Sequence, residues 1–416
     1  MPPEIILFGL CLVAVLAIAR LATWNPLVGL LVWVSFLPLQ LDTVGALGIR
    51  LAPSDLILAG LTTAAAFRLL KQRPLVPQMD DILRATLILL GWLCVASIST
   101  MLSVGHMATY VVINKLLGFA SLVLTYVIVR TTLGPIDMIR QALHWYCIVG
   151  SVWNLLGLGG YALWKWGGIL SPMIYHPHGE DRLQGFLLDP NAYAGFVVSV
   201  ALVQLAIGAR PLPGYSTRVA VLNSALLLLG IFLADSRSAW LAMTCGVVVM
   251  ALHVALREHR RILIPCLLLG TISVGFLWLS LQSDLRDNSL VERMDLVHLA
   301  LASVASSPLW GSGLGWHDSL IHSTYLWLLA ETGLIGFMLL GTFLIGLYIR
   351  IRIAWNSADS QTLQVGLAGV AVLGGWMGLM IGLESLYQRH YWYLMAVVCS
   401  ASWADRSGTS SSRKGR

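Results

Sequence analysis

Apolar runs about as long as a bilayer is thick recur along this chain, and they restrict it to a multi-span membrane protein. A helix crosses the hydrocarbon core in about 20 apolar residues. Of the 416 residues, 57% are hydrophobic and only 11% are charged, against about 25% charged residues in soluble proteins. The runs lie at about 4–22, 26–41, 53–70, 82–103, 108–129, 137–161, 191–209, 219–235, 239–256, 262–281, 323–349, 364–384 and 386–404. The sequence therefore predicts an all-α polytopic fold with 12–13 transmembrane helices, because the first two and the last two runs are barely separated.

Basic residues in the short connections predict the orientation, since cytoplasmic loops are enriched in Lys and Arg. With thirteen spans the basic groups fall on one side, at Arg68-Lys71-Arg73, Arg130, Arg210 and Arg218, Arg257-Arg260-Arg261, Arg350-Arg352 and Arg406–Arg416. The N-terminus and the segments 162–190, 235–238, 282–322 and 385–391 then lie together on the outer side. We expect one transmembrane domain over residues 1–406 and a disordered, basic cytoplasmic tail over 407–416.

Charge and cysteine usage exclude other classes. The net charge of +6 follows the membrane topology, so we expect membrane lipid and no nucleic acid as a partner. Only four of the 26 basic residues are Lys, and Arg suits phosphate oxygens, although a GC-rich genome gives the same bias. All six cysteines fall inside apolar runs, which predicts buried thiols and no disulfide framework or zinc site.

The longest polar interruption is residues 282–322. Ser289 and Glu292 have the spacing of a capping box, which predicts a short helix from Ser289 to about Ala305 with Arg293 in its first turn. Pro308 ends this helix. The glycines of the segment 311–315 predict a loop that passes close to another backbone or to a ligand.

His322 stands at the start of the next apolar run and shares a helical face with Tyr325. Glu331 is half a turn out of phase and about 13 Å deeper by helix rise. We therefore expect Glu331 to hydrogen-bond within the bundle and not to pair with His322. A histidine at the interface is a candidate catalytic group, and a structural role is the alternative.

Two further outer segments carry polar residues. Asp189 and Pro190 predict a helix start, so Asp189 and Asn191 either only begin a helix or take part in a site. Arg182 precedes that helix. The histidines His176 and His178 with Glu180 and Asp181 are a weak candidate for a metal site.

Arg237 lies in a connection with almost no loop, beside Asp235. Charge this close to the hydrocarbon is costly unless it is paired or used. Arg237 is therefore either half of an interfacial ion pair or an arginine held towards an anionic group.

Four segments in order resemble the O-antigen ligase and polymerase superfamily of bacterial inner membranes. They are Arg182-Leu183-Gln184-Gly185-Phe186 with Asp189-Pro190-Asn191, Ser236-Arg237-Ser238-Ala239-Trp240, Pro308-Leu309-Trp310-Gly311-Ser312-Gly313, and His322-Ser323-Thr324-Tyr325-Leu326 with Glu331-Thr332-Gly333-Leu334-Ile335-Gly336. The resemblance extends from about residue 20 to residue 404. Two positions depart from the family pattern: Ser323 stands where Asn usually follows the histidine, and Asp235 precedes the Ser-Arg motif.

The resemblance implies a GT-C-like fold and an inverting membrane glycosyltransferase without metal or other cofactor. It implies a donor glycan on undecaprenyl diphosphate, an acceptor hydroxyl on lipid A–core or another glycan, and an active site facing the periplasm. It also implies roles for particular residues: His322 as the catalytic histidine, Arg237, Arg293 and less firmly Arg182 as ligands of the diphosphate, and Tyr325, Asp189 and Asn191 as positioning residues.

The residue types agree with that chemistry. A leaving diphosphate needs stabilisation, which arginines supply through charge-assisted hydrogen bonds. An attacking hydroxyl must lose a proton, and His accepts one near neutral pH. We expect Arg237 and Arg293 to bind the diphosphate and His322 to orient or deprotonate the acceptor.

The sequence leaves several functions open. A ligase transfers finished polymer and a polymerase extends a chain on a single repeat, and both need the same donor chemistry. A protein O-oligosaccharyltransferase is a third option, although such enzymes often have a larger C-terminal region. A transporter or flippase would carry polar residues deep in several spans. Only Glu331, with Asp55 and Glu384 near run ends, is such a residue here.

Overall fold

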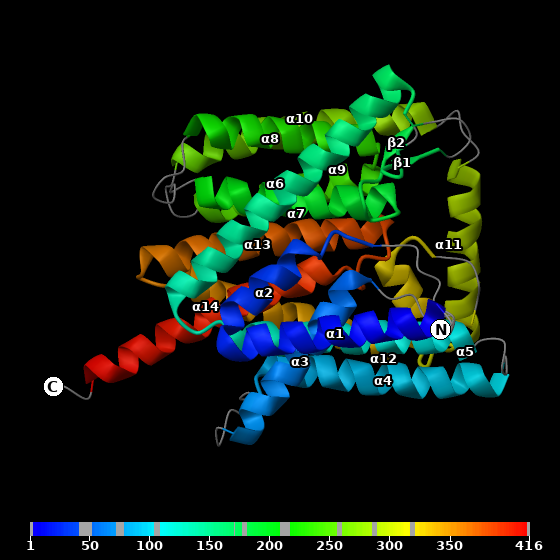
Figure 1. The fold of residues 1–416 in the computed structure, drawn as a ribbon. Helices are drawn as coiled ribbons and strands as arrows, with labels where there is room; N and C mark the ends of the chain where they lie inside the picture. Colours follow the sequence, from blue (N-terminus) through cyan, green and yellow to red (C-terminus); the bar gives the residue numbers. More distant parts are fainter. Residues whose placement is uncertain are drawn as a thin grey trace.

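The computed structural model is a bundle of α-helices with one short β-hairpin (Figure 1). It describes residues 3–40, 52–71, 79–103, 109–169, 171–176, 181–208, 217–255, 260–284, 289–316 and 321–413. The elements of this part of the chain are α1 (Pro3–Trp24), α2 (Pro26–Ser35), α3 (Pro53–Lys71), α4 (Asp81–Ser103), α5 (Thr109–Thr132), α6 (Ile136–Gly167), β1 (Ile174–Tyr175), β2 (Arg182–Leu183), α7 (Pro190–Gly208), α8 (Thr217–Ala234), α9 (Arg237–Ala255), α10 (Arg260–Asp284), α11 (Ser289–Ser306), α12 (Thr324–Trp355), α13 (Ser360–Gly382) and α14 (Arg389–Arg413). The two strands are antiparallel, with Tyr175 opposite Arg182.

The expected all-α polytopic membrane fold is confirmed. Seven of the described helices are long and apolar enough to cross a membrane, namely α4, α5, α6, α7, α9, α12 and α13. The short helix α11 runs from Ser289 to Ser306, where the capping-box spacing predicted it. The side chains of Glu292 and Arg293 lie outside the described part of the chain.

The second apolar run differs from its expectation as a helical span. Helix α2 has only ten residues, which is about 15 Å of helix and half the thickness of the hydrocarbon core. It begins with Pro26 after an Asn25 cap, whose side chain accepts a hydrogen bond from Val28 N. Beyond Ser35 the chain turns, and Gln40 N donates to Phe186 O at 2.8 Å. Residues 36–40 of this run are thus outside regular helix.

The bundle has two ends, which we call the α11 end and the C-terminal end (Figure 1). The α11 end carries α11, β1 and β2, the start of α1, and the starts of α7, α9, α12 and α14. The C-terminal end carries the end of α14. The composition of residues 407–416 predicts disorder, and α14 continues to Arg413. Its side chains from Ala404 onward lie outside the described part, so the order of the tail stays a prediction.

The bundle core lies around α7 and α13, which are the most buried of the candidate spans. Aromatic rings fill the space between α12, α13 and α14: Trp376 stacks on Tyr391 with ring centroids 5.2 Å apart, and Trp392 stacks on Phe343 at 5.0 Å. The cysteines are free thiols. Three of them are buried as expected, whereas Cys94 is exposed on the outer surface of α4.

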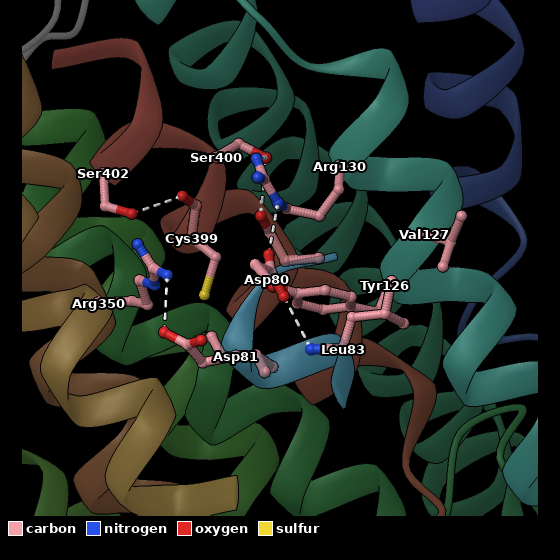
Figure 2. A network of polar contacts seen from close by, with 12 residues as sticks. Asp80, Asp81, Leu83, Tyr126, Val127, Arg130, Arg350, Cys399, Ser400 and Ser402 are labelled. Carbon is pink, nitrogen blue, oxygen red and sulfur yellow. Dashed lines mark hydrogen bonds and ion pairs between the residues drawn. The ribbon is translucent and has the colours of Figure 1, made fainter. Parts of the chain in front are cut away.

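At the C-terminal end, charged side chains meet one another (Figure 2). Asp80 caps α4 by accepting from Leu83 N at 2.7 Å, and it also accepts from the Tyr126 hydroxyl at 2.8 Å and lies 3.4 Å from Arg130 Nε. Arg350 of α12 reaches Asp81 at 3.2 Å. This network joins α4, α5 and α12 at one end of the bundle.

Candidate active site

The turn between α8 and α9 places Arg237 at the first position of a helix. Asp235 has a φ of 45°, a left-handed conformation that is uncommon outside glycine. The buried Ser236 hydroxyl caps α9 by accepting from Ala239 N at 3.4 Å. Arg237 is half-buried at the α11 end. The two-residue turn therefore fixes the position of Arg237 along the axis of the bundle.

Arg182 forms hydrogen bonds to this turn. Its guanidinium donates to the carbonyl oxygens of Ala234 at 3.1 Å and Asp235 at 2.9 Å, and to Asn191 Oδ1 at 3.2 Å. Asp189 in turn accepts from Asn191 N at 2.8 Å. One chain of hydrogen bonds thus links β2, the start of α7 and the α8–α9 turn.

The expectations for these residues are met in part. Asp189 begins α7 as predicted, and Asp189, Asn191 and Arg182 lie together. Arg182 is engaged with backbone oxygens of the turn that carries Arg237. Its contact with a diphosphate stays a prediction.

The glycine-rich loop fits onto a break in α12. Gly333 has φ 67° and ψ −170°, which interrupts the helix. The carbonyls of Ala330 and Glu331 accept instead from Ser312 N and Gly313 N, each at 2.9 Å. On the other side of the break, Leu334 N donates to Pro308 O at 2.9 Å. Backbone groups that the break would leave unpaired are thereby satisfied.

The two glycines at this crossing have no room for a side chain. A Cβ on Gly311 would meet the backbone of Glu331, and a Cβ on Gly333 would meet the backbone of Leu309. The expectation that the loop passes close to another backbone is confirmed.

Glu331 is paired inside the bundle, as expected. Lys115 Nζ of α5 lies 2.8 Å from Glu331 Oε1, and Gly315 N donates to Glu331 Oε2 at 3.0 Å. The two side chains are only 17% and 4% exposed. The ammonium also lies 4.7 Å from the centre of the Trp327 ring. Sequence reasoning missed this lysine, although its position inside an apolar run was a signal that it has a buried partner.

His322 is exposed and immediately precedes the N-cap of α12. The Ser323 hydroxyl accepts from Leu326 N and donates to Met380 O at 3.3 Å. The Thr324 hydroxyl donates to Leu383 O at 2.8 Å, and Tyr325 donates to Met377 O at 3.1 Å. The side chains of three consecutive residues thus bind the start of α12 to the last residues of α13, which lie at the α11 end of the bundle.

The start of α9 meets the same end of α13. The Ser238 hydroxyl, one residue after Arg237, donates to Gly382 O at 2.9 Å. Arg237 and His322 therefore lie at the same end of the bundle, on segments attached to one helix terminus. A structure with these two residues at opposite ends would have contradicted the expected site. Arg293 is in the first turn of α11 at this end, and its side chain is outside the described part.

Of the candidate metal ligands, His176 and Asp181 are described, and they contact each other. His176 Nδ1 lies 2.7 Å from Asp181 Oδ1, and Lys165 Nζ lies 2.6 Å from Asp181 Oδ2. Hydrogen bonds from Lys165 and Trp164 lower the pKa of Asp181 to about 2. His178 and Glu180 lie outside the described residues. Within the described residues, no group of three or more His, Cys, Asp and Glu side chains is placed to hold a metal ion.

Comparison with known proteins gives one family. Residues 222–341 match the family model described as O-antigen ligase. The matched region runs from α8 to the middle of α12 and includes Arg237, Arg293 and His322. A search of curated proteins found no match. Over these residues the match supports the superfamily to which the sequence motifs point.

Proposed function

We propose that this membrane protein of the O-antigen ligase family transfers a glycan from undecaprenyl diphosphate to an acceptor hydroxyl at the periplasmic face of the bacterial inner membrane, as a surface polysaccharide ligase. One observation carries the proposal. The helix that begins with Arg237 and the helix preceded by His322 are both hydrogen-bonded to the last residues of α13, at the α11 end of the bundle. A cation for the leaving group and a base for the acceptor thus share one end of the bundle.

Arg237 and Arg293 bind the diphosphate of the donor. As the bond from the sugar to the diphosphate breaks, negative charge grows on the phosphate oxygens. Guanidinium groups stabilise such charge through paired, charge-assisted hydrogen bonds, most strongly where water is excluded. Arg237 is half-buried on a rigid two-residue turn, which favours a fixed position over a mobile surface charge. Arg182 supports that turn by three hydrogen bonds.

His322 orients or deprotonates the acceptor hydroxyl. An exposed imidazole at the mouth of a site can hydrogen-bond an incoming hydroxyl, and His exchanges a proton near neutral pH. Ser323 and Thr324, the residues that follow His322, are hydrogen-bonded to α13. The backbone that carries the histidine therefore has a fixed position. Glycan transfer then occurs by direct attack with inversion and needs no metal.

The test is transfer by the purified full-length protein in proteoliposomes. The donor is an undecaprenyl-diphosphate-linked glycan, and lipid A–core is the first acceptor. Transfer of finished polymer onto lipid A–core is the expected result.

Analysis of lipid-linked glycans in a deletion strain separates the alternatives. Accumulated undecaprenyl-linked polymer supports the ligase. Accumulated single repeats would replace it with the polymerase of the same superfamily. Accumulation of neither, with no transfer in proteoliposomes, would overturn the proposal in favour of another class such as a flippase.

A further inference from the structure

The turn between α13 and α14 lies between the two segments of the candidate site. Gly382 O accepts from Ser238 beside Arg237, at 2.9 Å. Leu383 O accepts from the Thr324 hydroxyl at 2.8 Å, and Ser385 N donates to that same hydroxyl oxygen at 2.9 Å. The residue between these anchors is Glu384, which is therefore held next to the segment of His322.

Glu384 is the one residue of the triplet 383–385 whose side chain reaches the surface. Leu383 and Ser385 are 7% and 0% exposed, whereas Glu384 is partly exposed. Its carboxylate has no hydrogen bond or ion pair among the described residues, in contrast to Glu331. Within the part of the chain that the structure describes, this acid at the α11 end thus has no structural partner.

The charges around Glu384 leave it without a cation of its own. Lys115 of α5 and Glu331 of α12 are the charged groups that act on it most strongly. The two are already paired with each other at 2.8 Å. On its own loop it faces the Tyr387 phenol, and Arg237 and His322 belong to the segments that bind the turn.

A carboxyl in these surroundings can exchange a proton under working conditions. Burial raises the pKa of Glu384 to about 7, Lys115 opposes this rise and Glu331 adds to it. A general base works best when its pKa lies near the operating pH. Ordinary surface carboxylates have a pKa of about 4 and are weak bases at that pH.

We propose that Glu384 is a further catalytic residue, which takes the proton of the acceptor hydroxyl during glycan transfer. This inference rests on the proposed function. The acceptor oxygen forms its bond to the anomeric carbon, and the bond from that carbon to the diphosphate breaks with its electron pair on the leaving oxygen. The hydroxyl proton passes to the Glu384 carboxylate, and His322 orients the hydroxyl without taking the proton. Glu384 then loses the proton to solvent through its exposed edge.

The experiment measures the transfer rate against pH for three variants in proteoliposomes: Glu384→Gln, Glu384→Asp and His322→Gln. The wild-type rate falls as pH drops below about 7, because the carboxylate becomes protonated. Glu384→Gln loses about 10²-fold or more in rate, and the remaining rate lacks that fall. Glu384→Asp recovers part of the rate and shifts the midpoint of the fall. His322→Gln is slower than wild type and retains the fall.

Two outcomes overturn the assignment. One is a Glu384→Gln variant with near wild-type rate. The other is a fall with pH that persists in Glu384→Gln and disappears in His322→Gln, which makes His322 the proton acceptor. A purely structural role of Glu384 would lower the melting temperature of both Glu384 variants equally and leave their pH profiles as in the wild type. If the wild-type protein itself transfers nothing from the lipid-linked donor, the proposed function fails, and that result is separate from these.

Discussion

The two ends of the bundle differ in how many of their charged residues are paired with one another. At the C-terminal end, acids meet bases: Asp80 lies 3.4 Å from Arg130, and Asp81 lies 3.2 Å from Arg350. At the α11 end, Lys165 pairs with Asp181 and Arg389 with Asp55. Arg182, however, bonds to backbone oxygens, and Glu384 has no hydrogen bond or ion pair among the described residues. Charges that are paired with one another fasten helices. Charges at a membrane end that are not paired in this way are costly unless a ligand uses them.

Neutral hydrogen bonds add to the ion pairs Lys165–Asp181 and Arg389–Asp55 in holding the α11 end. Serine and threonine hydroxyls bind the starts of α9 and α12 to backbone carbonyls of α13. Neutral hydrogen bonds fix the position of a backbone without neutralising the charged side chains beside it. The α11 end therefore has a fixed frame for the residues of the candidate site.

The largest expected effect is on catalysis at the α11 end. His322→Ala should lower the transfer rate by about 10²-fold, because an acceptor hydroxyl that is no longer held in position reacts that much more slowly. The protein should still insert and fold, because His322 is exposed. The matched control is His253→Ala in the last turn of α9, whose ring bonds to Val249 O. Full activity of the His322 variant would remove it from the site.

The next effect is on stability at the C-terminal end. Asp80→Ala leaves Arg130 buried without its carboxylate and removes the acceptor of the Tyr126 hydroxyl. Breaking a buried pair costs about 3–5 kcal/mol, so thermal unfolding in detergent should occur at a clearly lower temperature. The transfer rate per folded molecule should remain near that of the wild type.

The control for this variant is Asp137→Ala, since Asp137 is exposed in the first turn of α6. If Asp80→Ala unfolded like Asp137→Ala but lost transfer, the division of labour between the two ends would be wrong.

A smaller effect tests the frame of the α11 end. Gly333→Ala forces a Cβ into the backbone of Leu309 at a φ of 67°, and such strain costs about 1–3 kcal/mol. The helix break should loosen, and both the melting temperature and the transfer rate should fall. Gly341→Ala in the same helix is the matched control, because a Cβ there meets no atom within 4 Å. Equal melting temperatures for the two variants would show that the break does not depend on this conformation.

The smallest effect concerns the hairpin of the α11 end. The hydrogen bonds from Lys165 and Trp164 hold the pKa of Asp181 at about 2 in the folded protein, below the value of about 4 for an unfolded chain. The carboxylate therefore stabilises the fold above pH about 4, and this contribution is lost as pH falls towards about 2. Because the pair is exposed, solvent screens it and its contribution to stability is small.

This contribution can be measured by limited proteolysis of the hairpin as a function of pH. Cleavage should increase as pH falls through that window in the wild type. Asp181→Asn should show no change there. A pH dependence that remained in Asp181→Asn would assign it to another group.

Several features could be predicted because their cause is local. The length of the apolar runs predicts the membrane-spanning helices, and the capping box at Ser289 predicts the start of α11. The Asp189-Pro190 step gives the start of α7. The second run was misjudged for the same reason: its composition is apolar throughout, but the helix stops at Ser35, where contacts with the rest of the bundle begin to decide the backbone.

Pairings across the bundle could not be predicted in this way. Lys115 and Glu331 are separated by 216 positions, and no periodicity relates them. Glu384 was recognisable only as an acid near a span end. Its nearness to the segments of Arg237 and His322 follows from hydrogen bonds between three helix termini.

The sequence by itself determined that the chain is a helical membrane protein and which residues of the superfamily motifs it carries, and it predicted that Arg237 and His322 belong to outer segments. Run length, capping chemistry and motif order are properties of neighbouring residues, so the amino-acid sequence alone contains them. Only the tertiary structure decided that α9 and α12 begin against the same end of α13 and that a glycine loop completes the broken α12. It also decided that Glu384 lies between the two segments with no hydrogen bond or ion pair among the described residues. These depend on which backbone groups remain unpaired when distant helices pack, and that is fixed only by the whole bundle.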